Sequence, residues 1–166
     1  MQWQTNLPLI AILRGITPDD ALAHVGAVVD AGFDAIEIPL NSPQWEKSIS
    51  SVVKAYGGRA LIGAGTVLKP EQVDQLAGMG CKLIVTPNIQ PEVIRRAVSY
   101  GMTVCPGCAT ATEAFSALDA GAQALKNFPV VGVWSGLHQR AESGTSAGCS
   151  AICRRRRDAG KPSAMD

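Results

Sequence analysis

The sequence lacks the features that mark several large protein classes. Charged residues are only 17% of the 166 residues and sum to +1, so the composition gives no case for nucleic-acid binding. Aromatic residues are 5%, and the three tryptophans are scattered, which suggests no platform for stacking bases. No apolar stretch approaches the roughly 20 residues that a membrane helix needs, and residues 1–8 lack the pattern of a signal peptide. We therefore expect neither a nucleic-acid partner nor a membrane partner.

Cysteine is present in a number that does not suit a disulfide framework. The chain has five cysteines, an odd number, at positions 81, 105, 108, 149 and 153. Such a set in an otherwise ordinary chain suits a reducing compartment, so we expect a cytoplasmic protein. Cys105 and Cys108 form a CxxC motif, which could be a redox pair. A thioredoxin-like redox site lies at the start of a helix, whereas this motif closes a strand-like run, so a redox role is not favoured. Cys149, Cys153 and His138 lack a fourth ligand at zinc spacing, so no metal site is expected.

Short apolar runs alternate with helical patterns through the first 129 residues. Strands are expected over residues 9–14, 35–40, 60–66, 82–87, 102–105 and 122–128. The helices between them are expected to be capped at 17, 41–43, 69, 90 and 111 and to end near 31, 56, 78, 100 and 120. The strands are nearly continuous apolar runs, as in a parallel sheet that is covered on both faces. Six such units predict an α/β fold, either a doubly wound sheet or a (β/α)8 TIM-type barrel.

Two further absences narrow this choice. No glycine-rich GxGxxG sequence follows the first strand, which weakens a dinucleotide-binding interpretation. A length of 166 residues is short for a complete eight-stranded barrel, which typically has about 250. We therefore expect an incomplete barrel of about six βα units in residues 1–129, followed by an atypical tail in residues 130–166.

Polar residues occur where the expected strands end. They are Arg14, Glu37, Thr66, Pro87 and Lys126. Barrel enzymes place their chemistry at this carboxyl-terminal face. Glu37 lies inside an apolar strand, where a carboxylate is costly unless it is paired or functional. An ion pair with Arg14 or Lys126 and a catalytic role both remain open.

Lys126 lies near the end of an apolar stretch, which is unusual for lysine. At the mouth of a barrel its amine would be held partly dry, which penalises the ammonium form. Free amine attacks ketones and forms Schiff bases. The alternative is a lysine that extends from the strand end into solvent.

Six short motifs occur in order between about residues 7 and 129. They are LIAILRG at 9–15, IEIPLNSP at 36–43, GAGTV at 63–67, VTPN at 85–88, CPG at 105–107 and LKNFP at 125–129. Together they resemble the class I 2-keto-3-deoxy-6-phosphogluconate/galactonate aldolases. The PLNS sequence at 39–42 is similar to the galactonate branch, because the gluconate branch tends to carry threonine and arginine near 39 and 41.

The resemblance implies a role for each polar residue. Lys126 would form a Schiff base with the substrate ketone, and Glu37 would relay protons. Arg14 would hold the pyruvyl carboxylate, Thr66 would hydrogen-bond the same end, and Pro87 would shape the pocket wall. The implied partner is a small phosphorylated keto-deoxy sugar acid, 2-dehydro-3-deoxy-6-phosphogalactonate or its gluconate counterpart, which is cleaved to pyruvate and D-glyceraldehyde 3-phosphate. No metal or other cofactor is implied, and the family assembly would be a homotrimer.

The composition changes after Pro129. Residues 130–166 contain five of the nine arginines and sum to +3, whereas residues 1–129 sum to −2. We expect a frameshifted, truncated aldolase without the strands that hold the substrate phosphate. The sixth strand would then expose its hydrogen-bonding edge. An inactive remnant and a barrel that binds a small molecule without turnover remain alternatives to an active lyase.

Overall fold

The computed structural model describes residues 5–128 and the strand 153–155. Its sheet contains the strands β1 (Ala11–Ile12), β2 (Ala35–Pro39), β3 (Leu61–Gly65), β4 (Leu83–Thr86), β5 (Thr103–Cys108), β6 (Ala124–Asn127) and β7 (Cys153–Arg155). The first six strands alternate with the helices α1 (Pro18–Asp30), α2 (Trp45–Tyr56), α3 (Pro70–Gly78), α4 (Pro91–Ser99) and α5 (Ala111–Asp119). The alternation therefore agrees with the one expected from the sequence.

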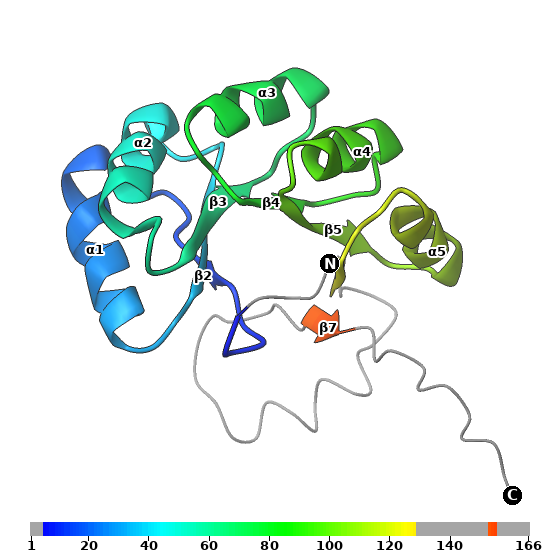
Figure 1. The fold of residues 1–166 in the computed structure, drawn as a ribbon, viewed down its shortest axis with the longest axis horizontal. Coiled ribbons are helices and arrows are strands. Elements are labelled where there is room, and N and C mark those ends of the chain that lie inside the picture. Colours follow the sequence, from blue (N-terminus) through cyan, green and yellow to red (C-terminus); the bar gives the residue numbers. More distant parts are fainter. Residues whose placement is uncertain (1–4, 129–152, 156–166) are drawn as a thin grey trace, which may run out of the picture.

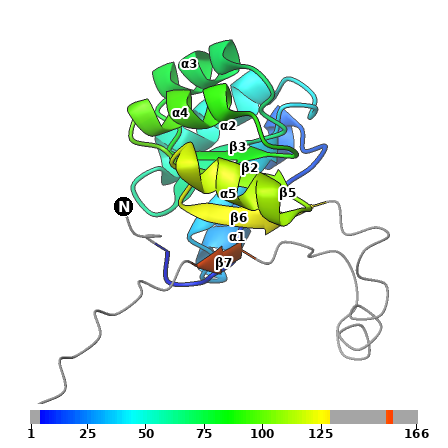
Figure 2. The same cartoon turned by 90° about the vertical axis from the view of Figure 1, so that its right-hand side faces the viewer.

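The strand order identifies the architecture. β1 to β6 are parallel, and each is paired with its neighbours in the chain. A doubly wound sheet would reverse its strand order at a switch point, so this order excludes that alternative for the described strands. Right-handed crossovers in one direction put every helix on the same face. Figure 1 shows α1 to α5 as an arc outside the strands, and Figure 2 shows the sheet beneath them from the side. The six strands form a parallel α/β half-barrel.

Proline and glycine mark the helix boundaries. α1, α3 and α4 each begin with proline in the first turn, where the missing N–H would have no helical partner. After the helices, glycine adopts the left-handed backbone that ends a helix at little steric cost. These glycines are Gly32, Gly80, Gly101 and Gly121, with φ of 96°, 83°, 71° and 103°.

Two boundaries differ from expectation. Residue 44, not the segment 41–43, precedes α2, and Gln44 has a left-handed φ of 47°. Asn41 and Ser42 instead bind the loop after β1: Ser42 Oγ accepts a hydrogen bond from Gly15 N at 3.0 Å. β5 extends to Cys108, beyond the expected end at 105, because Pro106 and Gly107 continue the pairing with β4 and β6.

The expectation that β6 has an open hydrogen-bonding edge is wrong. β7 pairs with β6 in antiparallel direction, with Cys153 opposite Lys126 and Arg155 opposite Ala124. The composition of the tail gave no sign of this strand. The other expectations for the tail, including the frameshift, concern mainly residues 129–152 and 156–166, which lie outside the described residues, as do the candidate metal ligands His138 and Cys149.

The two faces of the sheet contact different sets of side chains. On the outer face, Ile36, Ile38 and Ile84 are fully buried in a cluster with the helices. On the inner face, a smaller cluster contains Ile10, Ala35, Leu83, Val85, Cys105 and Ala124. Side chains alternate across a strand, so β2, β4 and β5 each contribute buried residues to both clusters.

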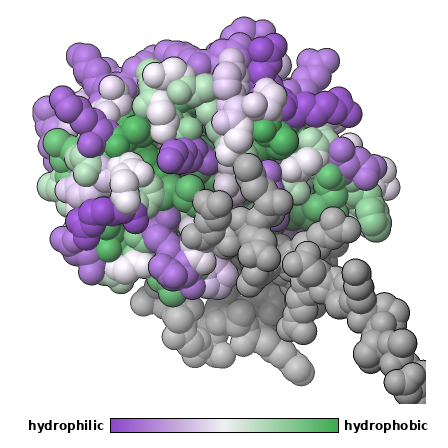
Figure 3. All heavy atoms as spheres, viewed as in Figure 1, coloured by the Kyte–Doolittle hydropathy of each residue, from purple (hydrophilic) through white to green (hydrophobic). Residues whose placement is uncertain are grey.

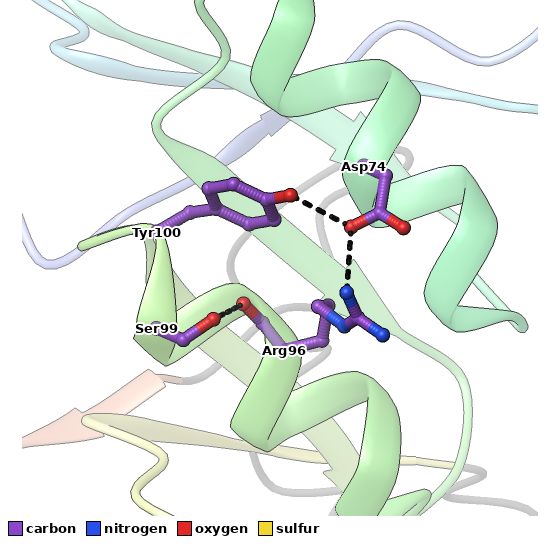
Figure 4. A network of polar contacts seen from close by, with 4 residues as sticks. All are labelled: Asp74, Arg96, Ser99 and Tyr100. Carbon is purple, nitrogen blue, oxygen red and sulfur yellow. Dashed lines mark hydrogen bonds and ion pairs between the residues drawn. The ribbon is translucent and has the colours of Figure 1, made fainter.

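In the face shown in Figure 3, polar residues predominate along the rim formed by the helices, and apolar surface shows both between the helices and at the end of the arc that carries α5. A small polar network joins α3 to α4. Asp74 Oδ1 accepts hydrogen bonds from Arg96 Nη1 at 3.3 Å and from Tyr100 Oη at 3.0 Å (Figure 4). In the described part of the chain, every helix is too short or too polar to cross a lipid bilayer.

Candidate active site

Glu37 and Lys126 project into the interior of the half-barrel. Glu37 follows Ala35 by two positions on β2, and Lys126 follows Ala124 by two positions on β6. Both alanines belong to the inner cluster, so the alternation of side chains puts the carboxyl and the amine on the same face. Glu37 is 3% exposed and Lys126 is 8% exposed. Such burial does not fit the alternative of a lysine that extends into solvent.

The interior changes the acidity of Glu37. Burial raises its pKa from 4.5 to about 7, while the positive charges of Lys126 and Arg14 oppose this rise. A carboxyl group with this pKa is about half protonated at neutral pH, so it can both accept and donate a proton. Ion pairs in residues 5–128 join Asp30 to Arg59 and Asp74 to Arg96, and Glu37 takes part in neither. The alternative of a structural ion pair is therefore not favoured.

An aromatic ring lies beside the amine of Lys126. The Nζ atom is 4.9 Å from the centroid of the Phe128 ring, within the range of a cation–π interaction. Phe128 was not among the candidate residues. Its spacing of two from Lys126 was the available signal, because residues i and i+2 lie on the same side of an extended chain.

Arg14 follows β1 and is exposed. Its Nη1 donates a hydrogen bond to Asn41 Oδ1 at 3.3 Å, which uses one of the five N–H donors of the guanidinium group. The positive charge acts on Glu37, which connects this loop electrostatically with the interior. Arg14 therefore lies close enough to influence the buried acid.

Thr66 and Pro87 follow β3 and β4, and both are half-buried. Thr66 has a φ of 59°, a left-handed conformation that is unusual for a β-branched residue and costs on the order of 1–3 kcal/mol. Pro87 lies against Gly107 of β5, where an added Cβ would be 2.5 Å from the Pro87 carbonyl oxygen. Strain and close backbone packing thus occur at the strand ends beside the buried pair.

The arrangement combines a buried primary amine with an acid that titrates near neutrality. These are the groups that Schiff-base chemistry requires, a nucleophile and a proton carrier. Within residues 5–128, no three His, Cys, Asp or Glu side chains gather as metal ligands. Cys105 and Cys108 are thiols that lie three positions apart on β5, so their side chains point to opposite faces.

Comparisons with known proteins agree with this geometry. The family model "KDPG and KHG aldolase" matches residues 2–139, and the chain belongs to this family. A relative from Escherichia coli K12, 2-dehydro-3-deoxy-6-phosphogalactonate aldolase, is 84% identical over 129 residues, which are 78% of this chain and 63% of the relative.

Solved structures also match. One described as a native KDPGal structure is 83% identical, with a TM-score of 0.77, and the match covers 79% of this chain and 64% of that one. A KDPG aldolase from Legionella pneumophila, with pyruvate captured as a covalent carbinolamine, is 26% identical with a TM-score of 0.70. That match covers 82% of this chain and 66% of the other. The chain thus spans less than two thirds of the length of these proteins.

Proposed function

We propose that this chain carries the Schiff-base centre of a class I aldolase, an aldehyde-lyase that cleaves 2-dehydro-3-deoxy-6-phosphogalactonate. The observation that carries the proposal is the buried pair of Lys126 and Glu37 on the inner face. The high identity with a galactonate-type aldolase supports the choice of substrate. The gluconate counterpart is the alternative substrate.

The pairing register of the strands supports the proposal that Glu37 and Lys126 lie at the same height along the barrel axis. Glu37 pairs with Gly63, Gly63 with Leu83, and Leu83 with Thr103, whereas Lys126 pairs with a residue four positions beyond Thr103. In a (β/α)8 barrel the eight strands share a shear of about 8 residues, or about one per strand. β6 is four strands from β2, so this offset puts Glu37 and Lys126 in the same layer. We propose the incomplete TIM-type barrel on this basis.

In the proposed reaction, Lys126 Nζ attacks the ketone carbon C2, and loss of water gives an iminium ion. The C3–C4 bond then breaks, and its electron pair passes into the iminium to give an enamine. Glu37 takes the proton of the C4 hydroxyl through a water molecule, which leaves D-glyceraldehyde 3-phosphate. The enamine regains a proton at C3 from Glu37, and hydrolysis of the resulting iminium releases pyruvate and the free amine.

The strand ends would bind the pyruvyl half of the substrate. Arg14 would hold the carboxylate, because a planar guanidinium can bind two oxygens at once. Thr66 would hydrogen-bond the same end, and its left-handed backbone supports a functional constraint there. Pro87 would form part of the pocket wall. No cofactor is required in this scheme, since the iminium is the electrophile.

Borohydride trapping with pyruvate tests the Schiff base. We expect a covalent adduct on Lys126, located by peptide mass spectrometry, and no adduct in Lys126→Met. A trapped adduct on another lysine, or none, would contradict the proposal. Lys82 is an exposed lysine at the opposite end of a strand, so Lys82→Met is the matched control that should leave the adduct unchanged.

Cleavage of the phosphorylated sugar acid separates the remaining alternatives. Adduct formation with cleavage indicates an active aldolase, and adduct formation without cleavage indicates a remnant. Binding of pyruvate without an adduct indicates a binding barrel. We further propose residues 1–129 as the barrel portion, residues 130–166 as an atypical tail of which β7 pairs with β6, and a cytoplasmic location. Sedimentation would test whether the chain forms the homotrimer of the family.

A further inference from the structure

Gly65 lies directly against the carboxyl group of Glu37. A Cβ atom added to Gly65 would be 1.3 Å from Glu37 Oε2 and 2.5 Å from Glu37 Cδ. Ordinary contact with a Cβ begins at 3.4 Å, so the oxygen would have to move by about 2 Å. No side chain larger than hydrogen fits at position 65 while the carboxyl keeps its position.

The backbone of Gly65 gives no other reason for glycine. Gly65 ends β3 in ordinary strand conformation, opposite Pro39 of β2. Its carbonyl oxygen accepts a hydrogen bond from Leu40 N at 2.9 Å. Since this bond and the ladder hold the backbone, an added methyl group would displace the carboxyl and not the strand.

Glu37 is equally constrained at its own backbone. It pairs with Ile12 of β1 on one side and with Gly63 of β3 on the other. Its carboxyl nevertheless contacts Gly65, two residues beyond its partner Gly63. The side chain therefore leans along the sheet toward the carboxyl ends of the strands, where the substrate-binding residues are proposed.

We propose that Gly65 is a positioning residue, whose missing side chain provides the space that holds the Glu37 carboxyl at the reaction centre. The catalytic meaning of this space rests on the proposed aldolase function. The contact itself does not, because it is a property of the folded chain.

Gly63 provides a matched comparison on the same strand and the same face. A Cβ at Gly63 would be 1.8 Å from the carbonyl oxygen of Leu83, which belongs to the backbone of β4. Alanine at either position should therefore destabilise the fold. Only the clash at position 65 can be relieved by shortening residue 37.

A double-mutant cycle on the full chain tests the contact. We expect Gly65→Ala to lower the urea midpoint of unfolding, and we expect most of this loss to disappear in the Glu37→Ala background. The loss caused by Gly63→Ala should be the same in both backgrounds. An equal loss for Gly65→Ala with and without the Glu37 carboxyl would overturn the proposal. If Gly65→Ala does not fold, recovery of folding by Glu37→Ala supports it, and lack of recovery contradicts it.

A second experiment tests the positioning role. Displacement of a catalytic group by an ångström or more can cost about 100-fold in rate. We expect Gly65→Ala to retain the borohydride-trapped pyruvate adduct while the exchange of pyruvate C3 protons falls by about 100-fold and its pH midpoint moves away from that of the unmodified chain. Unchanged exchange in Gly65→Ala would refute the positioning role. A wild-type chain that forms no adduct refutes the proposed function, and the stability cycle still decides whether Gly65 accommodates Glu37.

Discussion

The two faces of the six parallel strands differ in what their side chains do. The outer face presents large aliphatic residues such as Ile36, Ile38 and Ile84, all fully buried beneath the helices. The inner face presents a smaller apolar cluster, which includes Leu83 and Val85, together with glycines and the two buried charged residues Glu37 and Lys126. Neighbouring residues on one strand therefore point to opposite faces and have different roles. The outer face supplies most of the buried apolar area that stabilises the fold. The inner face buries less apolar area, because some of its positions hold the reactive groups.

The largest expected contrast is between Lys126 and its neighbour Leu125. Lys126→Ala removes the only proposed nucleophile, so the pyruvate adduct should fall by at least about 1,000-fold. Leu125→Ala changes a residue packed against the outer cluster, so it should lower stability and retain the adduct. Mass spectrometry after borohydride reduction measures the adduct. Equal adduct loss in both variants would remove the functional distinction between the two faces.

Ile38 tests the stabilising role of the outer face. Ile38 is fully buried, so Ile38→Ala should reduce the free energy of unfolding by about 2–5 kcal/mol through lost burial and the cavity that remains. Leu22→Ala is the control, because Leu22 is 42% exposed on α1 and should change stability by about 0.5 kcal/mol or less. Urea unfolding measures both values. A change in the free energy of unfolding for Ile38→Ala as small as that for Leu22→Ala would contradict the stabilising role of the outer face.

Glu37 tests the energetic cost of the inner face through pH. Because the folded pKa is raised to about 7 from 4.5, the folded state keeps a proton that the unfolded state loses between these values. Stability should therefore be greatest below pH 4.5 with respect to this group and should fall by roughly 3 kcal/mol as the pH rises through 7. Glu37→Gln should remove this slope. Urea unfolding between pH 4 and 8 makes the measurement, and an unchanged slope in the variant would disagree with a buried acid.

The smallest expected effect is at the polar network between α3 and α4. Arg96 and Asp74 are 49% and 40% exposed, so solvent screens their ion pair. Asp74→Asn should lower stability by about 1 kcal/mol or less, with a smaller loss in 1 M salt. Asp119→Asn, an exposed change on α5, is the control. A loss as large as that of Ile38→Ala would show that the helix surface contributes more than the comparison allows.

Most of the elements could be predicted from the sequence because their signals are local. Proline at helix starts and glycine after helix ends marked the boundaries, and apolar runs marked the strands. The start of α2 was placed wrongly because Ser42 binds the backbone of Gly15, a residue distant in the chain. The periodicity also could not separate a doubly wound sheet from a barrel, since both have the same local pattern and differ only in strand order.

Part of the candidate site could also be predicted from the sequence. Glu37 and Lys126 stood out because charged residues are rare in apolar strands, and the structure brings both to the interior. The contact between Glu37 and Gly65 depends on the register between two strands, and no local pattern encodes it. The catalytic roles of Glu37 and Lys126 remain predictions that the experiments above address. The binding roles of Arg14, Thr66 and Pro87 also remain predictions.

The sequential strand order has a consequence for biosynthesis. Each strand docks on the one made just before it, so no early strand waits for a partner that the ribosome has yet to deliver. Paired residues of β1 to β6 lie 19 to 26 positions apart in the chain, so each new pairing closes a loop of similar, moderate length. The nascent sheet can therefore widen from its first strand outward, with the newest strand always at the growing edge.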